Sequence, residues 1–179
     1  MMPDYKALRY ITSPNQVVSD SQNHHPGIDN SGPFLAMNPF SSRCCQHNHG
    51  FGWPYYAEHL VLATPDNGLA AVMYSACKAK IKVGSKGTEV TLHEQTNYPF
   101  EEAVRFTLST PSKVRFPMYL RIPSWCKNAS VKINGKQEAV TLVAGEYARI
   151  EREWTNKDEV ELMIPMDLNM RQWQANKNS

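Results

Sequence analysis

The sequence has little cysteine, little net charge and no long hydrophobic segment, and each lack excludes a class of protein. Its 179 residues include four cysteines, too few for a fold held together by disulfide bonds. Nineteen Lys and Arg against 17 Asp and Glu leave a net charge of +2, too small for the basic surface of a typical nucleic-acid-binding protein. The apolar run Leu69–Tyr74 is far shorter than the roughly 20 residues of a transmembrane helix, and no secretory leader follows Met1. We therefore expect a soluble chain without nucleic-acid or membrane partners, in a compartment that the sequence leaves unknown.

The first 42 residues show no sustained hydrophobic period. They are rich in Pro, Asn, Ser and Gly, which is typical of loops that line a site or of a piece of a larger fold. Only Tyr5–Ile11 is weakly helical in pattern. Further along, apolar residues between Trp53 and Leu62 recur at helical spacing. This spacing predicts one short helix there, with Pro54 in its first turn.

From Leu69 onward, apolar and polar residues alternate, which is the pattern of half-buried antiparallel strands. Asn134-Gly135 supplies the residue types of a tight hairpin turn. The predicted strands are 69–75, 79–83, 88–94, 103–109, 118–122, 130–133, 147–151, 159–164 and 168–171. Eight or nine strands at short spacing predict a mainly β chain with an antiparallel β-sandwich.

The segment Arg43–Gly50 holds the strongest candidate site: Cys44, Cys45, His47 and His49. Thiolates and imidazoles are natural ligands of Zn²⁺, but so short a stretch cannot wrap around one ion, so at most two or three of them would share a metal. A zinc-bound thiolate next to Arg43 would stay ionised near neutral pH, and Cys44 or Cys45 could then attack an electrophilic carbon. A packed, reduced dithiol or a strained vicinal disulfide without a catalytic role explains the same pair equally well.

The other candidate residues carry weaker signals. Glycosidases ordinarily need two carboxylates flanking the scissile bond, and the spacing singles out none of Glu58, Asp66, Glu101 and Glu102. Lone histidines are most often structural, which is the reading we give to His24, His25 and His59. Core packing is favoured over sugar stacking for Trp125, Trp154 and Trp173. Small, buried thiols are expected at Cys77 and Cys126.

Several motifs, in the same order along nearly the whole chain, resemble glycoside hydrolase family 127, the β-L-arabinofuranosidase family. These motifs are Arg43–Asn48, Gly52–Pro54, Ala57–Leu60, Gly68–Ala71, Thr96–Phe100, Leu120–Cys126, Val131–Gly135, Arg152–Trp154 and Ile164–Met166. The resemblance implies that residues 1–63 are the C-terminal loop and helix tail of an incomplete (α/α)6 catalytic barrel. Residues 64–179 would be the β-sandwich that follows the barrel, truncated at its C-terminus.

The resemblance also implies roles for individual residues. Cys44 matches the family's nucleophile, which forms a thioglycosyl intermediate with retention of configuration, and Cys44 and Cys45 match two ligands of one Zn²⁺. His47, His49 and Trp53 would contact the substrate, a non-reducing-end β-L-arabinofuranoside or a related plant-polysaccharide sugar. The longer parent could be a dimer and would be cytoplasmic or periplasmic.

Parts of the family's site have no counterpart in the sequence. The acid/base glutamate and a Glu-x-Cys pair of zinc ligands precede the cysteine pair in the family, whereas this sequence has no glutamate before Glu58. The isolated chain is therefore expected to be inactive as a hydrolase. The alternative hypothesis is a non-catalytic β-sandwich that serves as an accessory or carbohydrate-contacting module.

Overall fold

The computed structural model describes residues 8–9, 35–36 and 43–168, and the chain divides into two compact units, Met1–Glu58 and His59–Ser179. In the first unit, β1 (Leu8–Arg9) pairs antiparallel with β2 (Leu35–Ala36), and α1 spans Arg43–Glu58. The weak helical prediction around Leu8 is therefore wrong at Leu8 and Arg9. Within the described ranges, no helix has the length and apolar character needed to cross a membrane.

Helix α1 begins at Arg43 rather than at the predicted Trp53, and it places Pro54 in its C-terminal half. The sequence hides the first part of this helix because Gly50 and Gly52 are poor helix formers. Each costs about 1 kcal/mol relative to alanine, and an interior proline costs about 3 kcal/mol. Pro54 also has no N–H to donate to the carbonyl of Gly50. The predicted helix is wrong at its C-terminal end too, because Val61–Ala63 form a strand.

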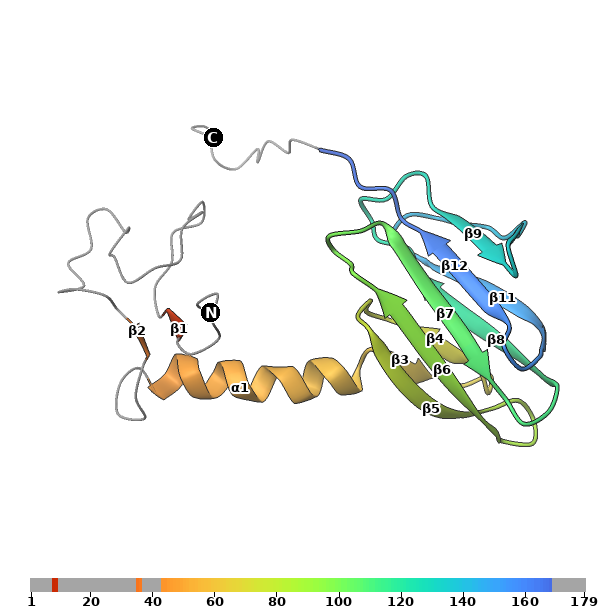
Figure 1. The fold of residues 1–179 in the computed structure, drawn as a ribbon, viewed down its shortest axis with the longest axis horizontal. Coiled ribbons are helices and arrows are strands. Elements are labelled where there is room, and N and C mark those ends of the chain that lie inside the picture. The colour runs from red at the N-terminus through yellow and green to blue at the C-terminus, as the bar shows by residue number, and fades with distance from the viewer. Residues whose placement is uncertain (1–7, 10–34, 37–42, 169–179) are drawn as a thin grey trace. The chain divides into compact units, whose positions relative to one another are not determined.

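The second unit is a β-sandwich of two layers (Figure 1). The larger sheet has the order β10-β9-β12-β7-β6-β5, and the smaller sheet has the order β11-β8-β4-β3. The strands are β3 (Val61–Ala63), β4 (Leu69–Ala71), β5 (Cys77–Val83), β6 (Thr88–Thr96), β7 (Ala103–Ser109), β8 (Val114–Arg121), β9 (Ser130–Ile133), β10 (Lys136–Gln137), β11 (Tyr147–Trp154) and β12 (Glu159–Met163). Neighbouring strands are antiparallel except β4 and β8, which run parallel with Leu69 opposite Met118. The predicted fold class, mainly β with an antiparallel-rich sandwich, is confirmed.

Strand β3 is the main addition to the predicted set. It pairs with β4, with Val61 opposite Ala71, so the sandwich includes residues that the predicted boundary at residue 63 assigned to the barrel tail. The last predicted strand, 168–171, is absent at Leu168, and its other residues lie outside the described ranges.

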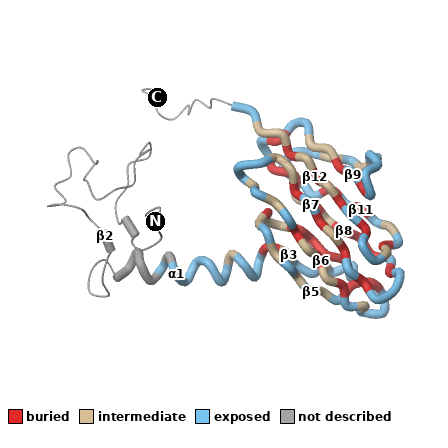
Figure 2. Tube along the Cα trace, in the orientation of Figure 1, coloured by how far each residue is buried: buried red, intermediate tan, exposed pale blue. Residues whose placement is uncertain are grey.

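The core lies between the two sheets, and buried residues alternate with more exposed ones along strands such as β6, β7, β9 and β12 (Figure 2). Val104, Phe106 and Leu108 of β7 are fully buried, as their alternation with polar residues predicts. The indole of Trp154 is also fully buried, and its Nε1–H donates a hydrogen bond of 3.0 Å to the carbonyl of Phe116. Core packing is therefore confirmed for Trp154, whereas it is wrong for Trp125, which is 44% exposed.

Two glycine-containing turns fix the geometry of the sandwich. Asn134 and Gly135 have φ values of 50° and 77°, and Ile133 pairs with Lys136, so the predicted two-residue hairpin is confirmed. At Gly68, a Cβ atom would lie 2.2 Å from the carbonyl oxygen of Pro117. Because only glycine avoids this clash, Gly68 permits the close approach of β4 to β8.

Candidate functional site

The predicted catalytic and substrate-contacting residues all lie on α1. Cys45, His49 and Trp53 occupy successive i, i+4 positions, and Cys44 and His47 are three residues apart. All five residues thus lie within three turns of one helix, but they do not share one face of it. The side chains of the two cysteines and the two histidines lie outside the described residues, so their roles stay predictions.

The donor set on α1 fits zinc chemically. Thiolate sulfur and imidazole nitrogen are preferred zinc ligands, and one helix can supply only part of a tetrahedral set. That two ligands come from Cys44 and Cys45 and the rest from elsewhere stays a prediction. Among the described side chains, no group of three or more His, Cys, Asp or Glu could hold a metal ion. The side chains of Cys44 and Cys45 are not among the described ones.

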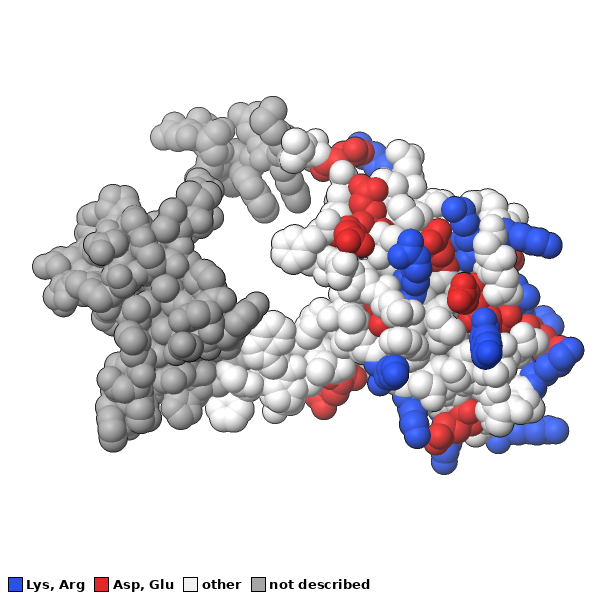
Figure 3. Space-filling model, in the orientation of Figure 1, with Lys and Arg blue, Asp and Glu red and all other residues white. Residues whose placement is uncertain are grey.

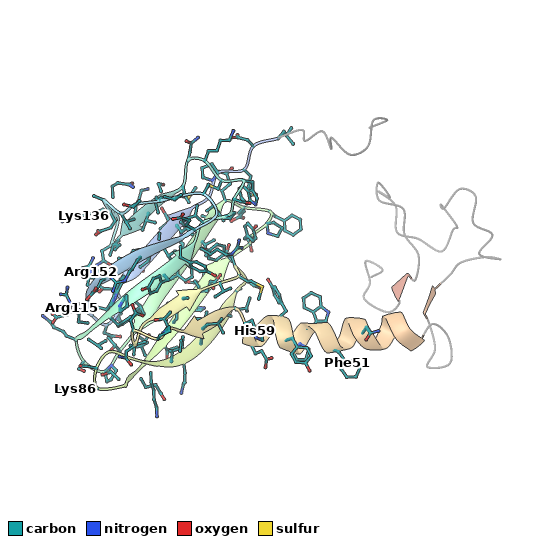
Figure 4. The ribbon with its side chains drawn as sticks, turned by 180° about the vertical axis from the view of Figure 1, so that it is seen from behind. Phe51, His59, Lys86, Arg115, Lys136 and Arg152 are labelled. Atoms are coloured by element: carbon teal, nitrogen blue, oxygen red, sulfur yellow. The ribbon has the colours of Figure 1, made fainter. Side chains whose placement is uncertain are left out.

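Aromatic side chains line the second half of α1. Phe51, Trp53 and Tyr55 are 64%, 58% and 65% exposed, and Figure 4 shows Phe51 projecting away from the helix axis. The rings of Trp53 and Tyr56 meet edge to face with centroids 6.0 Å apart. The exposure of Trp53 leaves part of its indole surface accessible, as stacking on a sugar ring requires.

The weaker candidates fall in different places. Glu58 ends α1, and His59 is exposed in the turn that follows. Glu101 accepts a hydrogen bond from the Asn97 amide at 2.9 Å, and Glu102 accepts one from the Met166 backbone N–H at 2.8 Å. These two carboxylates hold the turn between β6 and β7. The positions predicted at His24, His25 and Trp173 lie outside the described residues.

The outward face of the four-stranded sheet carries an open groove of about 490 Å³. Six residues line it: Thr64, Pro65, Asp66, Ala70, Tyr119 and Tyr147. The first three belong to the turn between β3 and β4, and the other three come from β4, β8 and β11. The sequence drew attention only to Asp66, because the alternation within β8 and β11 does not show that two tyrosines meet on one face.

A hydrogen-bond network surrounds the Asp66 carboxylate. Tyr119 donates its hydroxyl hydrogen to Asp66 Oδ2 at 2.7 Å, and Arg149 Nε donates to the Tyr119 oxygen at 2.9 Å. Arg149 also lies 3.5 Å from Asp66 Oδ2 and 2.8 Å from Glu151 Oε2. Hydrogen bonds from Thr64 and then Tyr119 lower the pKa of Asp66, so the carboxylate is ionised near neutral pH.

The six-stranded sheet presents a different surface. Figure 3 views this side of the sandwich and shows basic and acidic side chains interspersed over it. A recess of about 240 Å³ lies there, and two ion pairs to Glu161 form on its walls, from Arg105 at 3.0 Å and Lys132 at 3.5 Å. This face is therefore a polar, solvated surface.

Glu94 is a buried carboxylic acid that the sequence reading missed. It follows Val90 and Leu92 in the inward-facing series of β6. This inward position is the sequence feature that indicates its burial. Its side chain is fully buried, accepts the Ser75 N–H at 2.9 Å and lies 3.9 Å from the Cys77 sulfur. Burial raises the pKa of Glu94 to about 8, and burial together with Glu94 raises the pKa of Cys77 to about 11. The Cys77 thiol is thus protonated and unreactive near neutral pH.

Glu94 is expected to make the stability of the sandwich fall as pH rises. Its pKa is about 8 in the folded chain and about 4.5 when unfolded, so the folded state binds more protons between these values. The free energy of unfolding should decrease by up to about 1.4 kcal/mol per pH unit in this window and level off above it. Urea unfolding from pH 4 to pH 9 should show this slope, and Glu94→Gln should remove it.

The matched control is Glu89→Gln on the same strand, where the side chain is exposed. This variant should keep the pH slope of the unaltered chain. An unchanged slope in Glu94→Gln would contradict the assignment.

A family model described as the middle domain of the GH127 β-L-arabinofuranosidases matches residues 68–166. A crystal structure of a GH127 β-L-arabinofuranosidase from Geobacillus stearothermophilus T6 is 34% identical, with a TM-score of 0.66, over 73% of this chain and 20% of that one. No match is found among curated proteins.

Two further solved structures are similar. One, described as a glycoside hydrolase, is 27% identical with a TM-score of 0.68, over 82% of this chain and 24% of that one. The other, a GH127 β-arabinofuranosidase, is 24% identical with a TM-score of 0.51, over 58% of this chain and 18% of that one, and it supports the fold alone. The chain thus spans between a fifth and a quarter of the length of the first two structures.

Proposed function

Because the chain belongs to glycoside hydrolase family 127, we propose that it carries the nucleophile-bearing part of a retaining β-L-arabinofuranosidase. The observation that supports this proposal is the position of the cysteine pair. Cys44 and Cys45 lie on α1, which ends at Glu58, only a few residues before the sandwich that matches the family's middle domain. The substrate would be a glycan that contains β-L-arabinofuranosides.

In this proposal, Cys44 acts as the nucleophile. Its thiolate attacks the anomeric carbon, the bond to the leaving oxygen breaks, and a thioglycosyl intermediate forms with inversion. Water then displaces the sulfur with a second inversion, so the configuration is retained overall. The leaving oxygen needs a proton from an acid, and a glutamate outside this chain would donate it and would take up the proton of the attacking water in the second step.

The neighbours of Cys44 would prepare it for attack. Arg43 and Cys45 flank it, and a positive charge beside a thiol favours the ionised, nucleophilic form. Cys44 and Cys45 would hold Zn²⁺, whose charge supplies further stabilisation of the thiolate. The exposed indole of Trp53, two turns further along α1, offers a surface against which a sugar can stack.

A chimera tests this function directly. The part of this chain that matches the Geobacillus stearothermophilus enzyme, 73% of its residues, is extended to include Cys44 and replaces the corresponding fifth of that enzyme, which restores the barrel and its acid/base glutamate. We expect this chimera to hydrolyse an aryl β-L-arabinofuranoside with retention of configuration, and NMR of the sugar anomer that forms first measures this. The 179-residue chain alone should show no turnover.

The intact Geobacillus enzyme is the positive control, and circular dichroism with zinc analysis establishes that the chimera is folded and loaded. A folded, zinc-containing chimera without hydrolysis, or with inversion, would contradict the proposal.

A further inference from the structure

We propose that the groove between the β3–β4 turn and strands β4, β8 and β11 is a binding site for a neutral saccharide. The groove belongs to the β-sandwich, whereas the cysteine pair belongs to α1, and the proposal takes only its ligand class from the family. The groove, at about 490 Å³, lies within the 300–1,000 Å³ range of typical small-molecule sites.

Tyrosine rings and small apolar groups provide the surface on which a sugar could stack. Tyr119 and Tyr147 come from the adjacent strands β8 and β11, and Ala70 of β4 lies opposite Tyr119. Tyr147 is 45% exposed, whereas Ala70 is buried. The C–H faces of a sugar pack well against an exposed ring such as that of Tyr147. The Tyr119 ring already faces the Arg149 guanidinium, 5.8 Å from its centroid, and its hydroxyl is bonded to Asp66 and Arg149.

Asp66 of the lining and Arg149, which contacts Asp66 and Tyr119, form a polar rim beside the groove. Their contacts with the described residues leave some of their hydrogen-bonding positions unused. Those contacts engage three of the five N–H groups of Arg149: one with Tyr119, one with Asp66 and one with Glu151. Two N–H donors remain for a ligand. The Asp66 carboxylate has about four acceptor positions, and Thr64, Tyr119 and Arg149 engage three of them. Donors and acceptors side by side match the hydroxyl groups of a sugar.

The charges at the rim favour a ligand without net charge. Arg149 lies between Asp66 and Glu151, and Arg115 approaches the other oxygen of Glu151 at 3.4 Å. In Figure 4, which shows this side of the sandwich, Arg115 lies at the edge of the domain. The alternating charges compensate one another, so neither a phosphate group nor a charged peptide would find an excess of opposite charge. A polyhydroxyl ligand is the better match.

Titration of the 179-residue chain tests this site. L-Arabinose and an arabinan oligosaccharide are added up to about 50 mM, and ¹H–¹⁵N NMR follows the backbone signals, with an expected Kd in about the millimolar range. The shifts should concentrate at Thr64, Asp66, Ala70, Tyr119 and Tyr147. Tyr147→Ala should weaken binding about tenfold, and Tyr147→Phe should largely restore it.

The control is Phe100→Ala, which removes a ring that is 91% exposed in the turn between β6 and β7. Binding should not change in this variant, nor in Cys44→Ser, so the result is independent of the catalytic proposal. The absence of any shift in the unaltered chain, or shifts confined to other surfaces, would overturn the site. So would concentration-dependent dimerisation that Tyr147→Ala abolishes, because it would assign the groove to a second copy of the chain.

Discussion

Replacing Cys44 by serine is expected to lower kcat/KM of the chimeric enzyme by at least about 10³-fold. A free thiol ionises with a pKa of about 8.5, and a nearby cation lowers this value further. A serine hydroxyl ionises far less readily, so the variant would lack a nucleophile although its shape is almost unchanged. The measurement is hydrolysis of an aryl β-L-arabinofuranoside, with zinc content determined on the same samples.

The zinc measurement distinguishes two causes of inactivity. The Cys44→Ser variant could lose both zinc and turnover. If Cys44 is the nucleophile, restoring the metal with a high zinc concentration should still give no turnover. Cys77→Ser is the matched control, because its thiol lies in the sandwich beside Glu94. Full activity in Cys44→Ser, or equal loss in Cys77→Ser, would refute the assignment.

Replacing Trp154 by alanine should cost the chain about 3–5 kcal/mol of stability. The indole is fully buried, packs against the Phe116 ring at a centroid distance of 5.8 Å and donates to the Phe116 carbonyl. The variant leaves a cavity and an unpaired carbonyl between β8 and β11. Since the free energy of unfolding of a small domain is about 5–15 kcal/mol, a loss of this size leaves little stability. Urea unfolding of the two chains measures it.

Trp125→Ala is the matched control for the same change of residue type. Trp125 is 44% exposed, so its removal should change stability by no more than about 0.5 kcal/mol. A cost at Trp125 equal to that at Trp154 would show that the burial does not determine the effect.

The sandwich could be predicted because its strands have a solvated face and a buried face. The alternation of Val104, Phe106 and Leu108 with polar residues identified β7, and Asn134-Gly135 identified a hairpin. Helix α1 could not be predicted over 43–52, because the two glycines and Pro54 oppose helix formation locally. β3 has three residues, too few for a period to be recognised, and its pairing with β4 defines it.

The two candidate sites also differ in how far the sequence could predict them. The cysteine pair is contiguous, so its chemistry was visible in the sequence, whereas the groove combines residues from a turn and three strands. Asp66 and Arg149 are 3.5 Å apart in space but distant along the chain, and only the register of β4, β8 and β11 brings them together. Glu94 stands at an inward position of β6, and this position indicates burial. Its residue type favours a solvated side chain instead, so the sequence leaves its burial unpredicted.

The position of β12 in the larger sheet bears on how the protein is made. Among the described strands, β12 is the last to leave the ribosome, yet it lies in the interior of the sheet, between β7 and β9. Until it emerges, the nascent chain exposes two unpaired strand edges above apolar side chains, a state prone to association with other chains. The larger sheet can therefore be completed only after β12 has been synthesised, so the chain is most exposed to association before that point.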